Sequence, residues 1–303
     1  MKVWIVSGIF LPEIVSARRV IGRRTFDFDR EVAVMAIINR TPDSFYDRGK
    51  TFGLAQTIDA VEENIAAGAD WLDIGAVPNK ATAPEVSQRE ELDRLLPAIQ
   101  AARERTDAVI SAETYNAEVA RQALEAGADV INDVSGLHDL SLAEIVAQAN
   151  GTLIITHRLA HPRTPVPNPH YDDVVDEVSA FLRHRASQAI DTGLPADRII
   201  LDPAHDLNKD TYQSLELTRR LNEIAAIGYP VLAAVSNKDF IGQTLDRPVE
   251  DRLEGTIATV SFCIMQGARI VRVHNVREVL PAVRMVEALL GWRPPAAPKP
   301  KPH

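Results

Sequence analysis

The chain alternates between short apolar runs and longer segments in which apolar residues recur with helical spacing. The short runs have the length of strands, and a strand that is covered on both faces is apolar throughout. Eight such runs are present, at residues 32–39, 71–76, 109–114, 130–134, 152–157, 199–203, 231–236 and 270–275. The pattern therefore predicts eight buried strands that lie parallel to one another.

A segment with helical spacing follows each of these runs. The segments are residues 54–67, 87–105, 117–126, 140–149, 174–192, 214–227, 249–266 and 276–289. Glycine is common directly after the last residue of a helix, because it adopts the left-handed backbone conformation found there. Glycines stand at or just past the end of four of these segments, namely Gly68, Gly127, Gly228 and Gly267.

Eight strand–helix units in about 250 residues predict an α/β protein with a (β/α)8 TIM barrel. An open doubly wound sheet is the alternative, but it more often carries a glycine-rich turn after its first strand. No such turn occurs here. We expect residues 1–31 to form an N-terminal cap with an extra strand region and residues 32–292 to form the barrel. Residues 293–303 are rich in proline and are predicted to form a disordered tail.

Composition narrows the classes of function. Hydrophobic residues make up 46% of the 303 residues, the net charge is −9, and the pI is near 5.4. An acidic chain is a poor match for a nucleic-acid partner, which needs a basic surface. The one cysteine, Cys263, excludes a disulfide framework and a cysteine-based zinc site. No run reaches the roughly 20 apolar residues of a membrane span, and residues 1–11 lack a signal-peptide pattern. We expect a cytoplasmic protein.

Polar and charged residues gather where the predicted strands end. In a barrel of this type the catalytic groups come from the C-terminal ends of the strands. The residues at those ends are Asn39, Asp73, Glu113, Asn132, Asp133, His157, Asp202, Ser236, Asn237, Lys238, Arg272 and His274. For any one of these residues, solvation of the barrel rim is an alternative explanation to a role in the site. That explanation is weaker for the whole set, because buried Asp, Lys and Arg side chains require partners.

The loop after the first run carries the most specific chemistry. Asn39 ends the run, and Asp43 and Asp47 follow within nine residues of a polar loop. A carbonyl oxygen and two carboxylates are the hard ligands that Mg²⁺ with bound phosphates prefers. The loop therefore predicts a magnesium–phosphate site. His157 and His161 have helical metal-ligand spacing, but they begin at a strand end and lack the Glu of H-E-x-x-H, which disfavours a zinc site.

Five motifs, taken in order, resemble dihydropteroate synthase over about residues 32 to 290. They are Asn39-x-Thr-Pro-Asp-Ser-Phe45, Asn132-Asp133-Val134, Leu201-Asp202-Pro203, Ser236-x-Lys238-x-Phe240-Ile241-Gly242 and Arg272-Val273-His274. That family joins a pterin-methyl pyrophosphate to p-aminobenzoate and releases pyrophosphate. Its members are commonly homodimers, and the resemblance implies the same here.

The resemblance also implies roles for individual residues. Asn132 and Asp202 would hydrogen-bond the flat edge of the pterin, and Lys238 would contact its ring carbonyl. The pyrophosphate would be held by Arg272, His274 and Asn39. Asp43 and Asp47 would support Mg²⁺ and the cation that develops when pyrophosphate leaves, because nearby carboxylates stabilise such a charge.

The chain also departs from the family, and the departures indicate a preserved pterin and pyrophosphate half and a rebuilt aminobenzoate half. Glu113 replaces the usual Asp of the third strand, and Asn79 and Lys80 stand where the second loop usually has Thr and Arg. Ser236-Asn237-Lys238-Asp239 replaces Ser-Arg-Lys-Ser, whose second Ser lies at a helix N-terminus and helps receive the benzoate carboxylate. Asp239 brings its own anion to that position. Residues 204–207, Ala-His-Asp-Leu, replace a Gly-Phe-Gly-Phe-like stretch near the second substrate.

Three hypotheses follow from these motifs and departures. The first is a dihydropteroate synthase-like transferase with altered contacts to p-aminobenzoate or a related amine. The second is a paralogue that binds a pterin without synthase activity. The third is a methyl-folate-dependent methyltransferase, which the loop at residues 39–47 disfavours, because a methyl donor needs no phosphate clamp.

Overall fold

The computed structural model describes residues 5–6, 9–39, 53–75, 77 and 85–298. Its strands are β1 (Ile5–Val6), β2 (Ile9–Phe10), β3 (Arg18–Ile21), β4 (Arg24–Asp27), β5 (Ala33–Asn39), β6 (Trp71–Gly75), β7 (Val109–Glu113), β8 (Val130–Asp133), β9 (Thr152–Thr156), β10 (Ile199–Asp202), β11 (Val231–Ala233) and β12 (Ala268–Val273).

The helices described are α1 (Leu54–Ala66), α2 (Gln88–Arg105), α3 (Ala117–Ala126), α4 (Ser141–Gln148), α5 (Val174–Asp191), α6 (Thr211–Arg219), α7 (Leu221–Ala225), α8 (Asp239–Leu245), α9 (Leu253–Met265) and α10 (Val276–Leu289). Two short 3-10 helices cover Ala196–Arg198 and Val249–Asp251.

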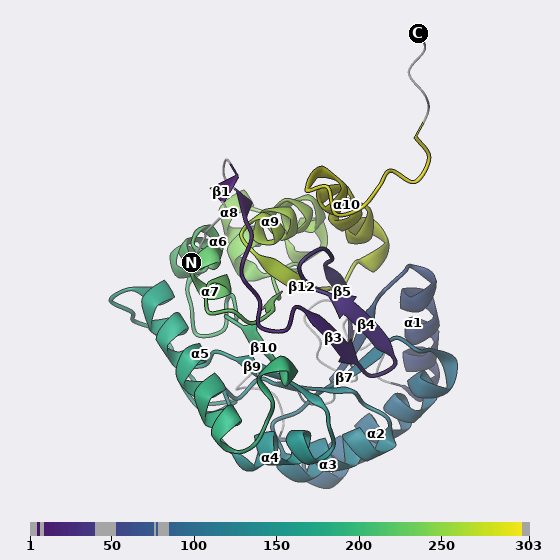
Figure 1. The fold of residues 1–303 in the computed structure, drawn as a ribbon. Coiled ribbons are helices and arrows are strands. Elements are labelled where there is room, and N and C mark those ends of the chain that lie inside the picture. Colours follow the sequence, from purple (N-terminus) through teal and green to yellow (C-terminus); the bar gives the residue numbers. More distant parts are fainter. Residues whose placement is uncertain (1–4, 7–8, 40–52, 76, 78–84, 299–303) are drawn as a thin grey trace.

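Eight parallel strands close into a barrel in the order β10-β11-β12-β5-β6-β7-β8-β9. The longer helices form a ring around it (Figure 1). The predicted (β/α)8 barrel is confirmed, and its closure excludes the open doubly wound sheet. Each of the eight predicted runs contains a barrel strand, although the strand at 231–236 is shorter than predicted and the last strand begins two residues earlier.

Alternation along the barrel strands separates two apolar clusters. On β5, Val34 and Ile38 belong to the larger cluster, which also contains the buried faces of the helices. Met35 belongs to the smaller cluster, together with inward residues such as Trp71 of β6 and Ile270 of β12. Side chains of a strand point to opposite faces in turn, so one apolar run covers both the inside of the barrel and the layer below the helices.

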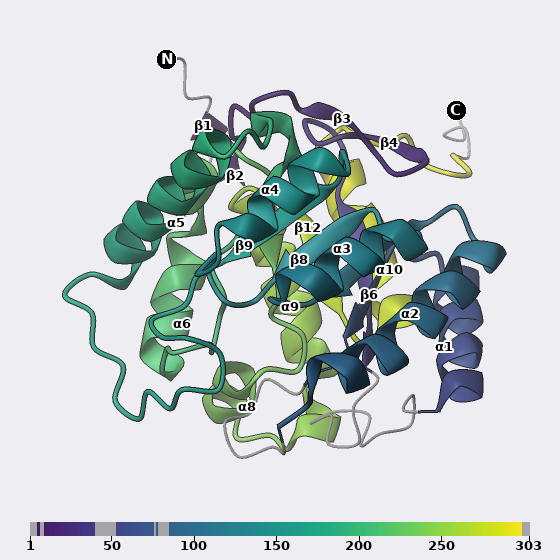
Figure 2. The same ribbon diagram turned by 90° about the horizontal axis from the view of Figure 1, so that it is seen from below.

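An antiparallel hairpin of β3 and β4 closes the N-terminal end of the barrel. Phe26 and Phe28 are buried, and their rings stack with centroids 5.7 Å apart. Phe26 also meets the edge of Trp71 from the barrel interior. Figure 2 shows the hairpin at one end of the barrel and α8 at the opposite end. The hairpin therefore fills the end of the barrel that the site does not use.

The helices differ from the prediction in three places. The helix predicted at 214–227 is divided at Arg220 into α6 and α7, and the one predicted at 249–266 is divided at Arg252 into a 3-10 turn and α9. Helix α8 was not among the helices predicted from the apolar pattern, although the resemblance implied a helix N-terminus at residue 239. Residues 290–298 contain no helix or strand, and the disorder expected for residues 293–303 stays a prediction.

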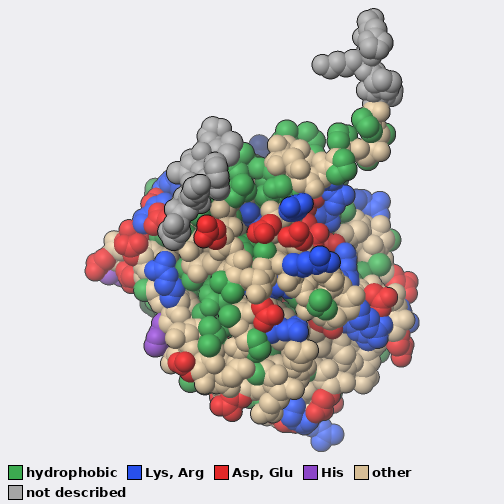
Figure 3. Space-filling view, viewed as in Figure 1, with side chains coloured by type: hydrophobic (Ala, Val, Ile, Leu, Met, Phe, Trp, Pro, Cys, Tyr) green, Lys and Arg blue, Asp and Glu red, His purple; other side chains and the backbone are tan. Residues whose placement is uncertain are grey.

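The face of the molecule seen in Figure 3 carries acidic and basic side chains side by side. Ion pairs such as Arg24–Asp70 and Arg23–Asp107 belong to the hairpin end of the barrel. In the described part of the chain, no helix is both long and apolar enough to cross a bilayer.

Candidate active site

Strand alternation places the polar strand-end residues inside the barrel mouth. The inward residues Trp71, Val109 and Val130 are apolar and belong to the inner cluster. Two positions further along β6, β7 and β8, the same face carries Asp73, Ser111 and Asn132. The interior of the barrel therefore changes from apolar to polar towards the C-terminal ends of the strands, where substrates bind in this fold.

The register between strands brings several of these ends to one level. Asn39 of β5 is aligned with Gly75 of β6, Gly75 with Glu113 of β7, and Glu113 with Asn132 of β8. Asn39 thus lies in the same row as Glu113 and Asn132. A Cβ added at Gly75 would make ordinary van der Waals contact with the Glu113 side chain at 3.6 Å, so this row has space for a small side chain there.

Arg272 of β12 is held by two carboxylates, from β6 and β7. Its Nε donates to Asp73 Oδ2 at 2.7 Å, and its Nη2 donates to Glu113 Oε2 at 2.7 Å. Burial opposes the guanidinium charge, but the carboxylates of Asp73 and Glu113 outweigh it and raise the pKa of Arg272. The extra methylene of Glu113, seen in the sequence as a departure, therefore places its carboxylate in an ion pair with Arg272.

Asp73 joins this ion pair to the neighbouring strands. It is fully buried and accepts hydrogen bonds from Ser111 Oγ at 2.6 Å and from Asn132 Nδ2 at 3.1 Å. The Asn132 amide oxygen is buried and has no hydrogen-bond partner among the described residues. A buried acceptor without a partner is unusual, so this oxygen is suited to accept a hydrogen bond from a ligand.

Asp202 ends β10 on the other side of the mouth. Its Oδ1 accepts a hydrogen bond from Ala204 N at 2.7 Å. Burial raises the pKa of Asp202, and the nearby positive charges of Lys238 and Arg272 oppose that rise. A buried carboxylate that faces two cations can accept hydrogen bonds from a planar donor edge.

Ser236 and His274 connect the ends of β11 and β12. Ser236 Oγ accepts a hydrogen bond from His274 N at 3.1 Å, and it also lies 3.1 Å from His274 Nδ1. Burial, together with the positive charges of Arg272 and Lys238, lowers the pKa of His274 to about 3. His274 is therefore neutral at pH 7 and can interact with an anion as a hydrogen-bond donor, not as a cation.

The segment from Ala204 to Lys209, between β10 and α6, packs against the start of α8. Lys238 Nζ donates to the main-chain oxygen of His205, and Asp206 Oδ2 accepts from Phe240 N at 3.1 Å. Asp239 lies in the first turn of α8, but its carboxylate is mostly exposed and pairs with Arg252 at 2.9 Å. The carboxylate that binds the α8 amide is therefore that of Asp206.

Lys209 also holds the segment from Ala204 to Lys209 in place, and it was not identified as a site residue from the sequence. Its buried Nζ donates to Ala204 O at 3.0 Å, to Leu207 O at 3.1 Å and to His157 Nδ1 at 3.1 Å. Burial lowers the pKa of Lys209 to about 7. Lys209 lies in a polar loop two residues before α6, and the sequence gives no signal of its burial, since two of its three partners are main-chain oxygens. His157, considered above for zinc, binds this lysine.

Four predicted site residues, Asp43, Asp47, Asn79 and Lys80, lie outside the described residues. The structure brings together most of the remaining ones at the barrel mouth. Within the described ranges, no group of three or more His, Cys, Asp or Glu side chains is arranged to hold a metal ion.

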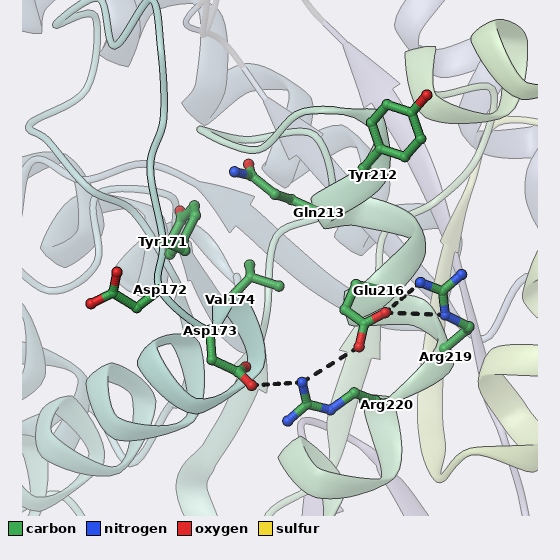
Figure 4. A pocket seen from close by; sticks show the side chains of 9 residues that line it. All are labelled: Tyr171, Asp172, Asp173, Val174, Tyr212, Gln213, Glu216, Arg219 and Arg220. Atoms are coloured by element: carbon green, nitrogen blue, oxygen red, sulfur yellow. Dashed lines mark hydrogen bonds and ion pairs between the residues drawn. The ribbon is translucent and has the colours of Figure 1, made fainter.

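A separate pocket of about 370 Å³ lies on the outside of the barrel, between the start of α5 and α6 (Figure 4). Four of its charged side chains pair with one another: Arg220 with Asp173 at 2.8 Å, and Arg219 with Glu216. None of the predicted site residues lines it. Because the predicted site residues gather at the barrel mouth and not at this pocket, we place the candidate active site at the mouth.

Comparison with known proteins agrees with this geometry. Residues 35–274 match the family model described as pterin binding enzyme. The dihydropteroate synthase of Haemophilus influenzae is 38% identical over 243 residues, which cover 80% of this chain and 88% of that protein. The chain belongs to the dihydropteroate synthase family. The family assignment made from the five motifs is thereby confirmed.

Relatives of both kinds, named as active and as inactive, occur within this family. A protein of Mycobacterium leprae named inactive dihydropteroate synthase 2 is 40% identical over 273 residues, covering 88% of this chain and 93% of its own. Among solved structures, Yersinia pestis dihydropteroate synthase in a sulfonamide drug complex has a TM-score of 0.86 at 32% identity, and covers 91% of this chain and 100% of its own. The Xanthomonas albilineans enzyme with 4-aminobenzoic acid has a TM-score of 0.83 at 33% identity, and the match covers 94% of this chain and 100% of that enzyme.

Proposed function

We propose that this chain is a dihydropteroate synthase-like transferase that joins a pterin-methyl pyrophosphate to an aromatic amine in folate biosynthesis. The observation that carries this proposal is the arrangement of Asp73, Asn132 and Arg272, in which the buried Asn132 amide oxygen has no partner in the described part of the chain. Such a site suits a flat ligand with a donor edge and an anionic tail. The family membership supports the same ligand.

In this proposal one group of residues binds the pterin ring and another binds the pyrophosphate. Asn132 and Asp202 hydrogen-bond the pterin edge, and Lys238 contacts its ring carbonyl. Arg272, His274 and Asn39 hold the pyrophosphate. His274 does so as a hydrogen-bond donor, and in the ligand-free protein burial and the charges of Arg272 and Lys238 lower its pKa to about 3. The bond between the methylene carbon and the pyrophosphate oxygen breaks, the electron pair leaves with pyrophosphate, and the amine nitrogen bonds to the carbon and then loses a proton. Asp43 and Asp47 stabilise the positive charge on the pterin-methyl group.

Mg²⁺ is part of the proposal. Asn39 lies at the C-terminal end of β5 in the row of Glu113 and Asn132, and its side-chain oxygen is a suitable hard ligand. Asp43 and Asp47 follow it in the sequence. When bound, the ion would neutralise charge on the leaving pyrophosphate. We expect Mg²⁺ to strengthen calorimetric binding of inorganic pyrophosphate to the wild type and to do so less in Asn39→Ala. Equal binding with and without Mg²⁺ would contradict this role.

A second candidate function is a pterin-binding paralogue without synthase activity. It is favoured by the contact of Asp206 with the Phe240 amide, which alters the wall where the amine is expected to bind. The mycobacterial relatives named as inactive support it as well.

A pyrophosphate-release assay separates the two functions. A transferase releases pyrophosphate only when the full chain, the pterin-methyl pyrophosphate, Mg²⁺ and an amine are present together. Pterin binding without release in the presence of any aromatic amine would favour the inactive paralogue. We further propose, from the resemblance to the family, that the chain acts in the cytoplasm as a homodimer. A sedimentation mass equal to the 33.3 kDa of one chain would contradict the dimer.

A further inference from the structure

The wall of the mouth between β10 and α8 contains a carboxylate-binding arrangement that the chain fills itself. The main-chain amide of Phe240, in the first turn of α8, donates to Asp206 Oδ2 at 3.1 Å. The hydroxyl of Ser214, in α6, donates to Asp206 Oδ1 at 3.1 Å. Two donors from two helices thus converge on one carboxylate, as they would on the carboxylate of a ligand.

The backbone around Asp206 keeps this carboxylate in place. Asp206 has a φ of +63°, and its own amide donates to Ser214 Oγ at 3.1 Å. On one side, Lys238 Nζ donates to the main-chain oxygen of His205. On the other side, Lys209 Nζ donates to the main-chain oxygens of Ala204 and Leu207. The left-handed conformation is uncommon outside glycine, and these contacts hold it.

A second carboxylate at this wall would meet two obstacles. The Phe240 amide and the Ser214 hydroxyl already donate to Asp206, so the new group would be desolvated without these partners. It would also lie close to the negative charges of Asp206 and Asp202, with Lys238 already balancing both. An uncharged substituent of the same shape would meet neither the repulsion nor the same loss of hydrogen bonds.

We propose that Asp206 is a specificity-determining residue that excludes amines bearing a carboxylate, so that the acceptor is an uncharged aromatic amine. The inference rests on the proposed function and refines its second substrate. It differs from the role expected for Asp239, whose carboxylate pairs with Arg252 at the surface. The residue that alters the amine side comes instead from the segment 204–207.

Calorimetry on the full chain tests the inference in two titrations. The first adds 6-hydroxymethylpterin in the presence of Mg²⁺ and pyrophosphate, and it reports on the proposed function alone. The second adds p-aminobenzoate or p-aminobenzamide to the chain saturated with those ligands, a mixture that cannot turn over. The two amines share a ring and an amino group and differ in the charge of one substituent. The variants are Asp206→Gly, which suits the left-handed backbone, and the control Asp246→Gly. Asp246 is exposed at the other end of α8 with a φ of +53°.

We expect the wild type to bind p-aminobenzamide at least about tenfold more tightly than p-aminobenzoate. Asp206→Gly should gain about tenfold or more for p-aminobenzoate and change less than about threefold for p-aminobenzamide, whereas Asp246→Gly keeps the wild-type ratio. The inference is overturned by equal affinity of the wild type for both amines, by no gain in Asp206→Gly, or by the absence of amine binding to every protein. Absence of pterin binding in the first titration overturns the proposed function instead.

Discussion

At the scale of single residues, the mouth is defined by how completely its buried charges are paired. Arg272 is held between Asp73 and Glu113 by hydrogen bonds of 2.7 Å each. Removing one partner of such a pair leaves an uncompensated buried charge. Glu113, which replaces the family's Asp, therefore has a structural role. Its carboxylate completes the pairing of Arg272, the arginine that we expect to face pyrophosphate.

His205 gives a residue-scale prediction about stability. It is fully buried, its ring stacks on Phe240, and neither ring nitrogen has a partner among the described residues. Such nitrogens cost about 1–3 kcal/mol, so His205→Leu, which is of similar size, should increase the free energy of unfolding at pH 7.5 by about that amount. Urea denaturation measures it. His184→Leu, on the exposed face of α5, is the matched control and should change stability by less than about 0.5 kcal/mol.

The advantage of His205→Leu should grow in acid. Burial lowers the pKa of His205 well below its usual value, so the folded protein resists protonation while the unfolded chain takes up a proton near pH 6.5. Protonation of the unfolded chain at His205 therefore leaves stability unchanged above pH 6.5, and the folded protein loses stability as the pH falls below that value. The leucine variant avoids this loss, which amounts to about 1.4 kcal/mol per pH unit below 6.5. A difference between variant and wild type that stays constant from pH 7.5 to 5.5 would contradict the explanation.

At the scale of the elements, local sequence patterns were enough to predict the barrel strands and the starts of several helices. Apolar runs are enough to locate the barrel strands, and caps such as Asn116 of α3 and Asp173 of α5 agree with the predicted helix starts. Helix α8 has only seven residues and begins after Asn237, whose φ is +55°, so no periodic pattern announces it.

The Asp206 contact could not be predicted for a related reason. Its partner Phe240 is 34 residues away in the sequence. The two residues come close in space because β10 and β11 are neighbouring strands of the barrel. The residue types at 204–207 indicated that the amine wall differs from the family. They did not show which carboxylate binds the amide at the start of α8, because that depends on tertiary packing.

The β3–β4 hairpin gives a prediction at the element scale. Phe28 is fully buried at the closed end of the barrel, so Phe28→Ala should lower the free energy of unfolding by about 3–5 kcal/mol. Val20→Ala on the same hairpin is the control, since Val20 is 58% exposed and should matter little. Chemical denaturation measures both. Pterin affinity of the folded Phe28→Ala protein should stay at the wild-type value, because the hairpin lies opposite the mouth (Figure 2). A loss below about 1 kcal/mol would show that the hairpin does not complete the core.

At the scale of the whole molecule, the residues that stabilise the barrel and those of the candidate site lie in different parts of it. Apolar residues fill the hairpin end and the layer under the helices, and the buried ion pair of Arg272 with Asp73 and Glu113 lies at the other end. The family's ligand would enter at the mouth, where β5, β7 and β8 present Asn39, Glu113 and Asn132 in one row. The central claim is that this mouth binds the pterin-methyl pyrophosphate.

The most direct test is calorimetric titration of pterin-methyl pyrophosphate, with Mg²⁺ and without any amine, into the full chain and into Asn132→Ala. We predict one site per chain in the wild type and affinity weakened at least about tenfold in the variant, because the ligand loses the buried Asn132 oxygen as a hydrogen-bond acceptor. Circular dichroism establishes that the variant is folded. No binding by the wild type, or equal affinity of a folded Asn132→Ala, would contradict the account.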